Sequence, residues 1–374
     1  MIQRLRRKFI AASMLALTLV LLVILLTGCG GELPETVPPA PETETAASAP
    51  QTTAQETRTP LAAEQPQPAQ LRMVFTFVGD CTFGGSQANA YAGYGFLKTV
   101  GEDYDYPFRN VRPWFENDDF TMANLEGVLG DKGHPAEKRY TFRGPASYAN
   151  ILTQNSVEAV TLANNHTMDY WQTGYDETKR ILDEAGLPFV EANASRLIPL
   201  ENGVTVGLYG SVYSSADVET VTAGIRELKR QGADVIIYAP HWGVEHSFRQ
   251  TQAQEELGRA AIDAGANIVY GCHPHVLQPI EEYHGGVIFY SLGNFSFGGN
   301  IYPGDYDTAV IQQELVLEED GGASLGQRTI VPCSVSSIES RNNFQPTPYA
   351  QDSEAYARVL SKLDGSYRGP NLQI

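Results

Sequence analysis

Short apolar runs that alternate with amphipathic helical patterns constrain the fold of this chain more than any other feature. The first run, 71–78, is rich in β-branched and aromatic residues and stops at Gly79-Asp80, as a strand does. Further apolar runs lie at 120–125, 157–163, 204–209, 235–239, 268–271 and 287–292. Helical patterns at 175–185, 222–231 and 254–264 separate several of them. Strands alternating with helices predict an α/β core with largely parallel strands.

The pattern changes after Ile280. Segment 282–287 is typical of a hairpin turn, and 308–316 and 329–335 have the composition of strands with no helix between them. Segment 349–363 predicts one amphipathic helix near the C-terminus. The later part of the chain is therefore expected to add strands without crossover helices.

The first residues carry an export signal. Four of the first eight residues are basic, and the apolar stretch 9–26 follows them. These two segments have the character of the charged and apolar regions of a secretory signal. The stretch ends in Leu26-Thr27-Gly28-Cys29, which resembles a bacterial lipoprotein box in which Cys29 becomes lipidated. The alternative is an uncleaved signal anchor. Both interpretations place most of the chain outside the cytoplasm on a membrane tether.

The segment that follows contains Pro, Glu, Thr, Ala and Gln, and no aromatic residue occurs in 30–70. Such a composition offers too little apolar surface to offset the ordering entropy, and it predicts a disordered tether. We therefore expect a lipoprotein signal peptide at 1–28, a tether at 29–70, an α/β domain at 71–340 and a helical extension at 341–374.

Charge limits the partners. The chain has 26 basic and 44 acidic residues, a net charge of −18, so it lacks the field that draws in nucleic acid. An anionic partner must meet a metal or a local basic cluster such as 137–145, where Arg143 could bind a carboxylate or phosphate through two hydrogen bonds. An ordinary solvated loop explains that cluster equally well.

The cysteines give a weaker signal. If Cys29 carries lipid, then Cys81, Cys272 and Cys333 remain, so at most one disulfide can form among them.

Metal-binding side chains follow five of the expected strands. The clusters are Gly79-Asp80, Asn124-Leu125-Glu126, Asn164-Asn165-His166 with Asp169, His241-Trp242-Gly243-Val244-Glu245, and His273-Pro274-His275. In open α/β sheets, ligands bind at the carboxyl ends of the strands. Oxygen and imidazole donors gathered there predict a site for Zn, Mn or Fe.

In order, these clusters and Tyr290-Ser291-Leu292-Gly293-Asn294-Phe295 resemble the motifs of the CapA family of poly-gamma-glutamate capsule biosynthesis proteins. This family is a branch of the calcineurin-like metallophosphatase superfamily. The resemblance runs from about Phe75 to about Phe297. It implies a four-layer α/β fold, in which two packed mixed sheets are flanked by helices.

The resemblance also implies roles for individual residues. The expected metal ligands are Asp80, Glu126 (bridging two ions), Asn165, His241, His273 and His275, and His166 is the expected acid near the leaving group. Asn124, Asp169, Arg143, Asn294 and Glu245 are expected around the ligands or the substrate. Glu245 would be a carboxylate that orients an imidazole.

One position departs from the superfamily pattern. The Asp-x-His motif reads Asp80-Cys81-Thr82, so one imidazole ligand is missing. We therefore expect one good metal site, built from Glu126, Asn165, His241 and His273, and one weakened or empty site that includes Asp80 and His275.

The lipoprotein box predicts a lipid-anchored protein at the cell membrane, and the resemblance implies that it helps to make, export or anchor an anionic surface polymer, poly-gamma-glutamate. The implied chemistry is metal-assisted hydrolysis or transfer, although whether the protein is an enzyme stays open. A second hypothesis is a non-catalytic protein that binds the polymer or stabilises a membrane-embedded synthase, which the histidine missing at Thr82 favours. A third is a stand-alone metallophosphoesterase or peptidase.

Overall fold

The computed structural model describes residues 70–86, 93–318 and 321–372, which belong to a unit that runs from Pro66 to Ile374. The expected signal peptide, Cys29 and the tether up to residue 69 lie outside the described residues. No helix among the described residues is long and apolar enough to cross a membrane.

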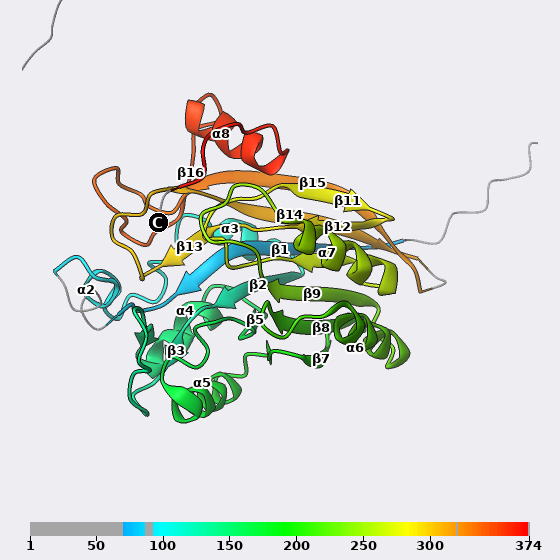
Figure 1. Cartoon of the computed structure of the whole chain (residues 1–374), viewed down its shortest axis with the longest axis horizontal. Helices are drawn as coiled ribbons and strands as arrows, with labels where there is room; N and C mark the ends of the chain where they lie inside the picture. The colour runs from blue at the N-terminus through cyan, green and yellow to red at the C-terminus, as the bar shows by residue number, and fades with distance from the viewer. Residues whose placement is uncertain (1–69, 87–92, 319–320, 373–374) are drawn as a thin grey trace, which may run out of the picture. The chain divides into compact units, whose positions relative to one another are not determined.

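Two large sheets form the centre of the described part of the chain (Figure 1). The eight-stranded sheet has the order β16-β15-β14-β1-β2-β5-β6, with β13 paired to β1. Its strands are β1 (Leu71–Thr82), β2 (Phe120–Leu125), β5 (Ala159–Thr161), β6 (Phe189–Val190), β13 (Asn294–Phe297), β14 (Asp307–Leu317), β15 (Ala323–Ser334) and β16 (Thr347–Pro348).

The six-stranded sheet has the order β11-β12-β10-β9-β8-β7. Its strands are β7 (Ala194–Pro199), β8 (Thr205–Val212), β9 (Val235–His241), β10 (Ile268–Tyr270), β11 (Ile280–Tyr283) and β12 (Gly286–Phe289). A separate pair joins β3 (Val128–Leu129) to β4 (Arg143–Gly144).

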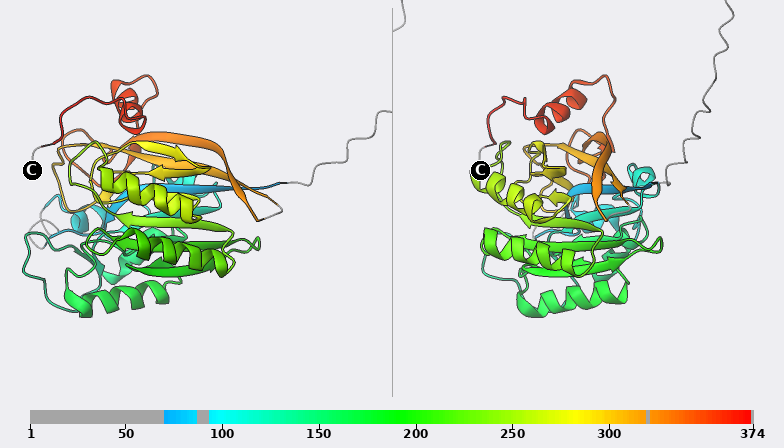
Figure 2. Two further views of the ribbon diagram at one scale, coloured as in Figure 1. Left: turned by 45° about the vertical axis from the view of Figure 1, so that its right-hand side comes forward. Right: turned by 90° about the vertical axis from the view of Figure 1, so that its right-hand side faces the viewer.

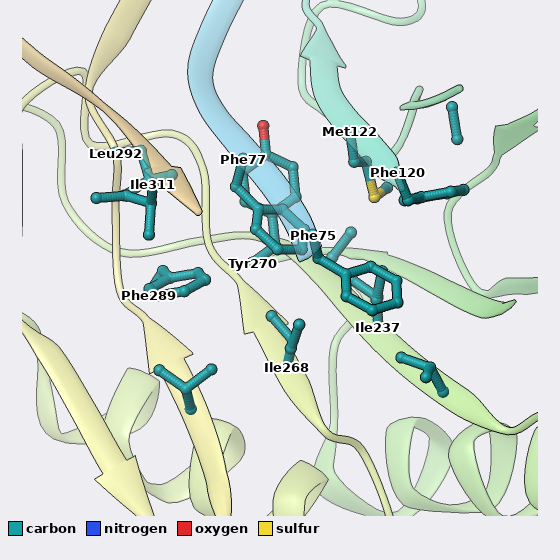
Figure 3. Close-up of a cluster of buried hydrophobic side chains, with 14 of the residues drawn as sticks. Phe75, Phe77, Phe120, Met122, Ile237, Ile268, Tyr270, Phe289, Leu292 and Ile311 are labelled. Carbon is teal, nitrogen blue, oxygen red and sulfur yellow. The ribbon is translucent and has the colours of Figure 1, made fainter. Parts of the chain in front are cut away.

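The main core lies between the two sheets (Figure 3). The Phe77 ring on β1 lies 5.1 Å from Tyr270 and 5.5 Å from Phe289 of the other sheet, measured between ring centroids. Alternate β1 residues face opposite sides, so Phe75 and Phe77 enter this core while Val78 packs on the outer face.

Helices cover both outer faces. On the six-stranded sheet lie α6 (Val218–Arg230) and α7 (Gln252–Ala264) (Figure 2). The other sheet is covered by α2 (Phe96–Val100), α3 (Arg112–Phe115), α4 (Ala149–Thr153) after a 3-10 turn at Ala146–Tyr148, and α5 (Trp171–Glu184). The order helix, sheet, sheet, helix confirms the expected four-layer α/β fold.

Parallel pairing brings the carboxyl ends of the central strands together. Strands β1, β2 and β5 pair in parallel in one sheet, and β8, β9 and β10 do so in the other. The register places Asp80 beside both Asn124 and Asn294. An isolated bridge joins His241 to Cys272. Residues that are far apart in sequence therefore meet at one edge.

The C-terminal part differs from expectation in one respect. The hairpin of β11 and β12 and the antiparallel pair β14 and β15 follow the prediction. The last helix, α8 (Glu354–Leu363), begins five residues later than Tyr349, because the preceding chain pairs as β16 with β15 and Ser353 caps the helix. Cys81, Cys272 and Cys333 are buried free thiols, so the structure contains no disulfide among them.

Buried ion pairs between charged side chains attach α8 to the eight-stranded sheet. The Lys362 side chain is 2% exposed, and its ammonium lies 2.8 Å from an Asp305 oxygen and 2.7 Å from an Asp307 oxygen. Arg358 donates two hydrogen bonds of 2.7 Å to Asp307. Although burial raises the pKa of a carboxylate, these cations bring the pKa of Asp307 below its ordinary value.

Candidate metal centre

The first donor group lies where β1, β2 and β9 end. Asp80, Glu126 and His241 are fully buried, and one ligand atom from each lies within 4.8 Å of the others. Asp80 lies near the end of β1, Glu126 directly follows β2 and His241 ends β9, so the rigid sheets fix their positions. Three converging donors are the number that catalytic zinc sites commonly take from the protein.

A second donor group stands on the loops after β9 and β10. Glu245, His273 and His275 also present ligand atoms within 4.8 Å of one another. His273 and His275 have positive φ angles of 102° and 58°. Such backbone conformations are costly for residues other than glycine and occur often at functional sites.

Close contacts connect the two groups. The His275 Nδ1 atom lies 3.2 Å from Asp80 Oδ2, and the His273 Nδ1 atom lies 3.1 Å from His241 Nε2. Asn165 Oδ1 is 2.9 Å from the same His241 nitrogen. The structure therefore brings all six residues expected as metal ligands into one centre.

The grouping within this centre differs from the sequence-based expectation. Asp80, placed in the weakened site by the resemblance, shares its donor group with Glu126 and His241. His273 lies instead with His275 and Glu245. Thr82, at the position of the missing imidazole, donates a hydrogen bond of 2.8 Å to the Glu126 carbonyl oxygen.

The chemistry of these residues fits a divalent cation. Glu126 Oε1 and His241 Nδ1 are buried without a hydrogen-bond partner among the described residues. Burial, and then the Asp80 charge, raises the pKa of Glu126 well above its ordinary value. Burial lowers the pKa of His241 well below its ordinary value. A cation beside Glu126 would pair with its orphaned Oε1 atom and offset the carboxylate charge.

The remaining imidazoles titrate in opposite directions. Burial and the neighbouring His275 lower the pKa of His273 to about 4. Burial also opposes the charged form of His275, yet the Glu126 and Asp80 carboxylates raise its pKa to about 10. Without a metal, protonated His275 is thus the cation nearest to the two carboxylates.

Asn124 holds the two carboxylates of the first group. Its Nδ2 atom donates to Asp80 Oδ1 at 2.8 Å and to Glu126 Oε2 at 3.5 Å. Asn164 in turn donates to Asn124 Oδ1 at 3.0 Å and accepts from the His166 amide at 3.1 Å. No role was predicted for Asn164, although its place in the Asn164-Asn165-His166 motif was a usable signal. Asn294 lies 2.9 Å from His275 Nδ1 and so orients that ring.

His166 and Asp169 form a buried pair beside the centre. Their Nδ1 and Oδ2 atoms are 2.7 Å apart, and Asp169 also accepts from the Phe142 amide and pairs with Lys138. Burial lowers the pKa of His166, although Asp169 opposes this shift. The Phe142 ring stacks on His166, with 4.2 Å between centroids. His166 Nε2 consequently faces Glu126 Oε1 at 3.8 Å.

Arg143, expected around the ligands or the substrate, lines a small pocket together with Glu126. Its guanidinium stacks 3.4 Å from the centroid of the Tyr170 ring and donates to the carbonyl oxygens of Asp131 and Lys132. It lines a cavity of about 780 Å³ together with Tyr170 and Glu177. These contacts show Arg143 bracing its own loop.

The fold and the donor set define a four-layer α/β protein with a buried centre of carboxylates and imidazoles. The family described as "Bacterial capsule synthesis protein PGA_cap" matches residues 74–299, and the chain belongs to this family. The resemblance to the CapA family, inferred from six motifs, is confirmed.

Two relatives illustrate this membership. The chain is 30% identical over 312 residues to the PGA biosynthesis protein CapA of Bacillus subtilis (strain 168), covering 77% of each protein. It is 30% identical over 319 residues to the capsule biosynthesis protein CapA of Bacillus anthracis, covering 78% of this chain and 73% of the relative.

Similarity to solved structures is weaker. The crystal structure of TT1561 of Thermus thermophilus covers 69% of this chain and 99% of that protein, with 9% sequence identity and a TM-score of 0.38. A likeness of this size carries no argument about function.

Proposed function

We propose that this protein acts outside the cytoplasm in the synthesis, export or anchoring of an anionic capsule polymer of the poly-gamma-glutamate class. We further propose that its metal centre carries out hydrolysis or transfer on that polymer or its precursor. The observation that carries the proposal is the convergence of six donor residues, two of which have a buried atom without a hydrogen bond, in a member of the capsule synthesis family. The name of the Bacillus subtilis relative, a PGA biosynthesis protein, supports the choice of polymer, and that of the Bacillus anthracis relative supports a role in the capsule.

Each residue has a task in this proposal. Asp80, Glu126 and His241 would hold a divalent ion such as Mn, Zn or Fe, which supplies Lewis-acid polarisation of an amide or phosphoryl oxygen. Asp169 fixes His166 through Nδ1, so that His166 can hold a proton at Nε2 and deliver it to the leaving group.

The charge of the chain agrees with this assignment. At a net charge of −18, long-range attraction of an anionic polymer is absent, so binding depends on local cations. Lys138 lies at the centre, paired with Asp169, and donates a hydrogen bond of 3.0 Å to the Asn165 carbonyl oxygen. A bound metal would add the larger local positive charge.

Cells that lack their own copy of this protein test the proposed function. Full-length wild type should restore the surface polymer, whereas His166→Ala should retain metal and restore little polymer, because general acid catalysis contributes roughly 10²–10⁴-fold. Polymer extracted from the cell surface and the metal content of each purified variant are the measurements. Full restoration by His166→Ala would contradict catalysis.

That outcome would favour the second candidate, a non-catalytic protein that binds polymer or stabilises a membrane-embedded synthase. The hydroxyl of Thr82 in place of an imidazole ligand is the observation behind this candidate. If wild type leaves polymer unchanged but hydrolyses phosphoesters or peptides, the stand-alone hydrolase is the correct function.

We also propose a lipid anchor at Cys29, after cleavage of a signal peptide at 1–28 and ahead of a tether at 29–70. The lipoprotein box supports this proposal, and it would hold the folded domain at the outer side of the membrane. Cys29→Ser should abolish incorporation of a fatty-acid probe in growing cells. Label that persists on Cys29→Ser would show that the anchor lies elsewhere.

A further inference from the structure

The position of Glu245 is unexpected for a residue that only orients an imidazole. That role requires a hydrogen bond between its carboxylate and a ring nitrogen. Among the described residues, the Glu245 carboxylate forms no hydrogen bond or ion pair with His273 or His275, although one of its oxygens lies within 4.8 Å of a nitrogen of each. Such a spacing exceeds a hydrogen bond. An ion bound among the three side chains would draw these atoms in to metal–ligand distances of roughly 2.0–2.2 Å.

The loop that carries Glu245 is held in place independently of any ion. The His246 amide donates to the Pro274 carbonyl oxygen at 2.8 Å, which ties this loop to the loop of His273 and His275. Buried Gln278 donates to the Ser247 and Arg249 carbonyl oxygens at 2.8 and 3.1 Å. The loop is therefore preorganised beside the two imidazoles.

The C-terminal segment adds a second support to the same loop. Asn371 Oδ1 accepts from the Phe248 amide at 3.0 Å, and the Leu372 amide donates to the His246 carbonyl oxygen at 3.2 Å. The Phe248 ring lies 4.6 Å from the Lys362 ammonium. Contacts from separate parts of the chain thus fix the backbone from residue 246 to residue 249.

We propose that Glu245 is a direct metal ligand, which completes a second ion site with His273 and His275. This inference rests on the proposed metal centre. It changes the expectation for the second site from weakened or empty to occupied by an O,N,N donor set. Carboxylate and imidazole donors suit Mn, Zn and Fe.

Manganese binding to the full-length protein tests the inference. Free Mn²⁺ gives a strong electron paramagnetic resonance signal that decreases on binding, so a titration reports the number and affinity of sites. Wild type should bind two ions. Glu245→Gln should bind one ion with the wild-type affinity, and its affinity for the other ion should fall by more than about 100-fold. A residue that only orients a ligand is expected to change the affinity by about 10–100-fold.

Glu256→Gln is the matched control, because Glu256 is an exposed glutamate on α7 that contacts Gln252. It should bind Mn²⁺ as wild type does. The melting temperature of metal-free Glu245→Gln should equal that of wild type, since the loop is held by other contacts. A purely structural role would lower this temperature.

Two results would overturn the inference in different ways. If Glu245→Gln binds as many ions as wild type with the same affinities, Glu245 is no ligand, and the proposed metal centre stands without it. If wild type binds no Mn²⁺, Zn²⁺ or Fe²⁺, the proposed metal centre itself fails.

Discussion

Glu126→Gln should abolish metal binding at the first donor group and at the same time stabilise the metal-free protein. The loss of binding should exceed about 100-fold, because a ligand is removed rather than a residue that orients one. The gain in stability follows from the buried Glu126 carboxylate, which lies beside Asp80 and has one oxygen that accepts no hydrogen bond among the described residues.

The pH dependence gives this prediction a sign. Burial, reinforced by Asp80, raises the pKa of Glu126, so the folded chain keeps a proton that the unfolded chain releases above its ordinary pKa of 4.5. The free energy of unfolding of the metal-free wild type therefore falls as the pH rises from 4.5 toward the raised pKa. Gln has no such titration, so Glu126→Gln should gain about 1 kcal/mol or more at pH 7 and little at pH 4.5.

Urea denaturation of metal-free protein at both pH values, together with a metal titration, measures the two effects. Glu177→Gln is a suitable control, since Glu177 is also buried but accepts a hydrogen bond of 2.6 Å from the Lys132 amide. It should keep its metal. A Glu126→Gln protein that is destabilised at pH 7, or that binds metal normally, would contradict this description of the centre.

Lys362→Met should lower the free energy of unfolding by about 3–5 kcal/mol and loosen α8 from the sheet. The substitution leaves Asp305 and Asp307 buried without their shared cation. Arg358 still pairs with Asp307, yet Asp305 then has no cation among the described residues. Burial already raises the pKa of Asp305 despite Lys362, so its charge depends on this pair.

The change in the midpoint of urea denaturation gives the magnitude. Lys229→Met, on the exposed face of α6, is the control and should cost less than about 0.5 kcal/mol. Adding Asp305→Asn to Lys362→Met should recover part of the loss, since the uncompensated charge is removed. A loss below about 1 kcal/mol for Lys362→Met alone would show that the buried ions add little stability.

Much of the fold was predictable because period and composition are local properties. The run at 71–78 and the helical pattern at 254–264 correspond to β1 and α7 within a few residues. The second sheet and the four layers were implied by the resemblance to a family, because the alternation of strands and helices does not say how many sheets form. Strands of two residues, such as β3 and β4, carry too short a pattern to be detected.

The donor residues were predictable for a related reason. Parallel pairing of β1 and β2 places Asp80 and Glu126 at one edge, but His241 ends a strand of the other sheet and reaches them only through the packing of the two sheets. The positions of the other site residues depend on loops. The positive φ angles of His273 and His275 turn these residues toward Glu245, and the braced position of Arg143 depends on Tyr170. Long-range loop packing of this kind leaves no periodic signal in the sequence.

The metal content of the purified full-length protein tests the central claim most directly. Protein from cells grown with Mn, Fe and Zn should be dialysed and analysed by inductively coupled plasma mass spectrometry, beside Glu126→Gln and His241→Ala. We expect wild type to carry about one or more transition-metal ions per chain. Both variants should lose most of that metal. Wild type without metal, or His241→Ala with a full complement, would contradict the claim that these buried residues form a metal centre.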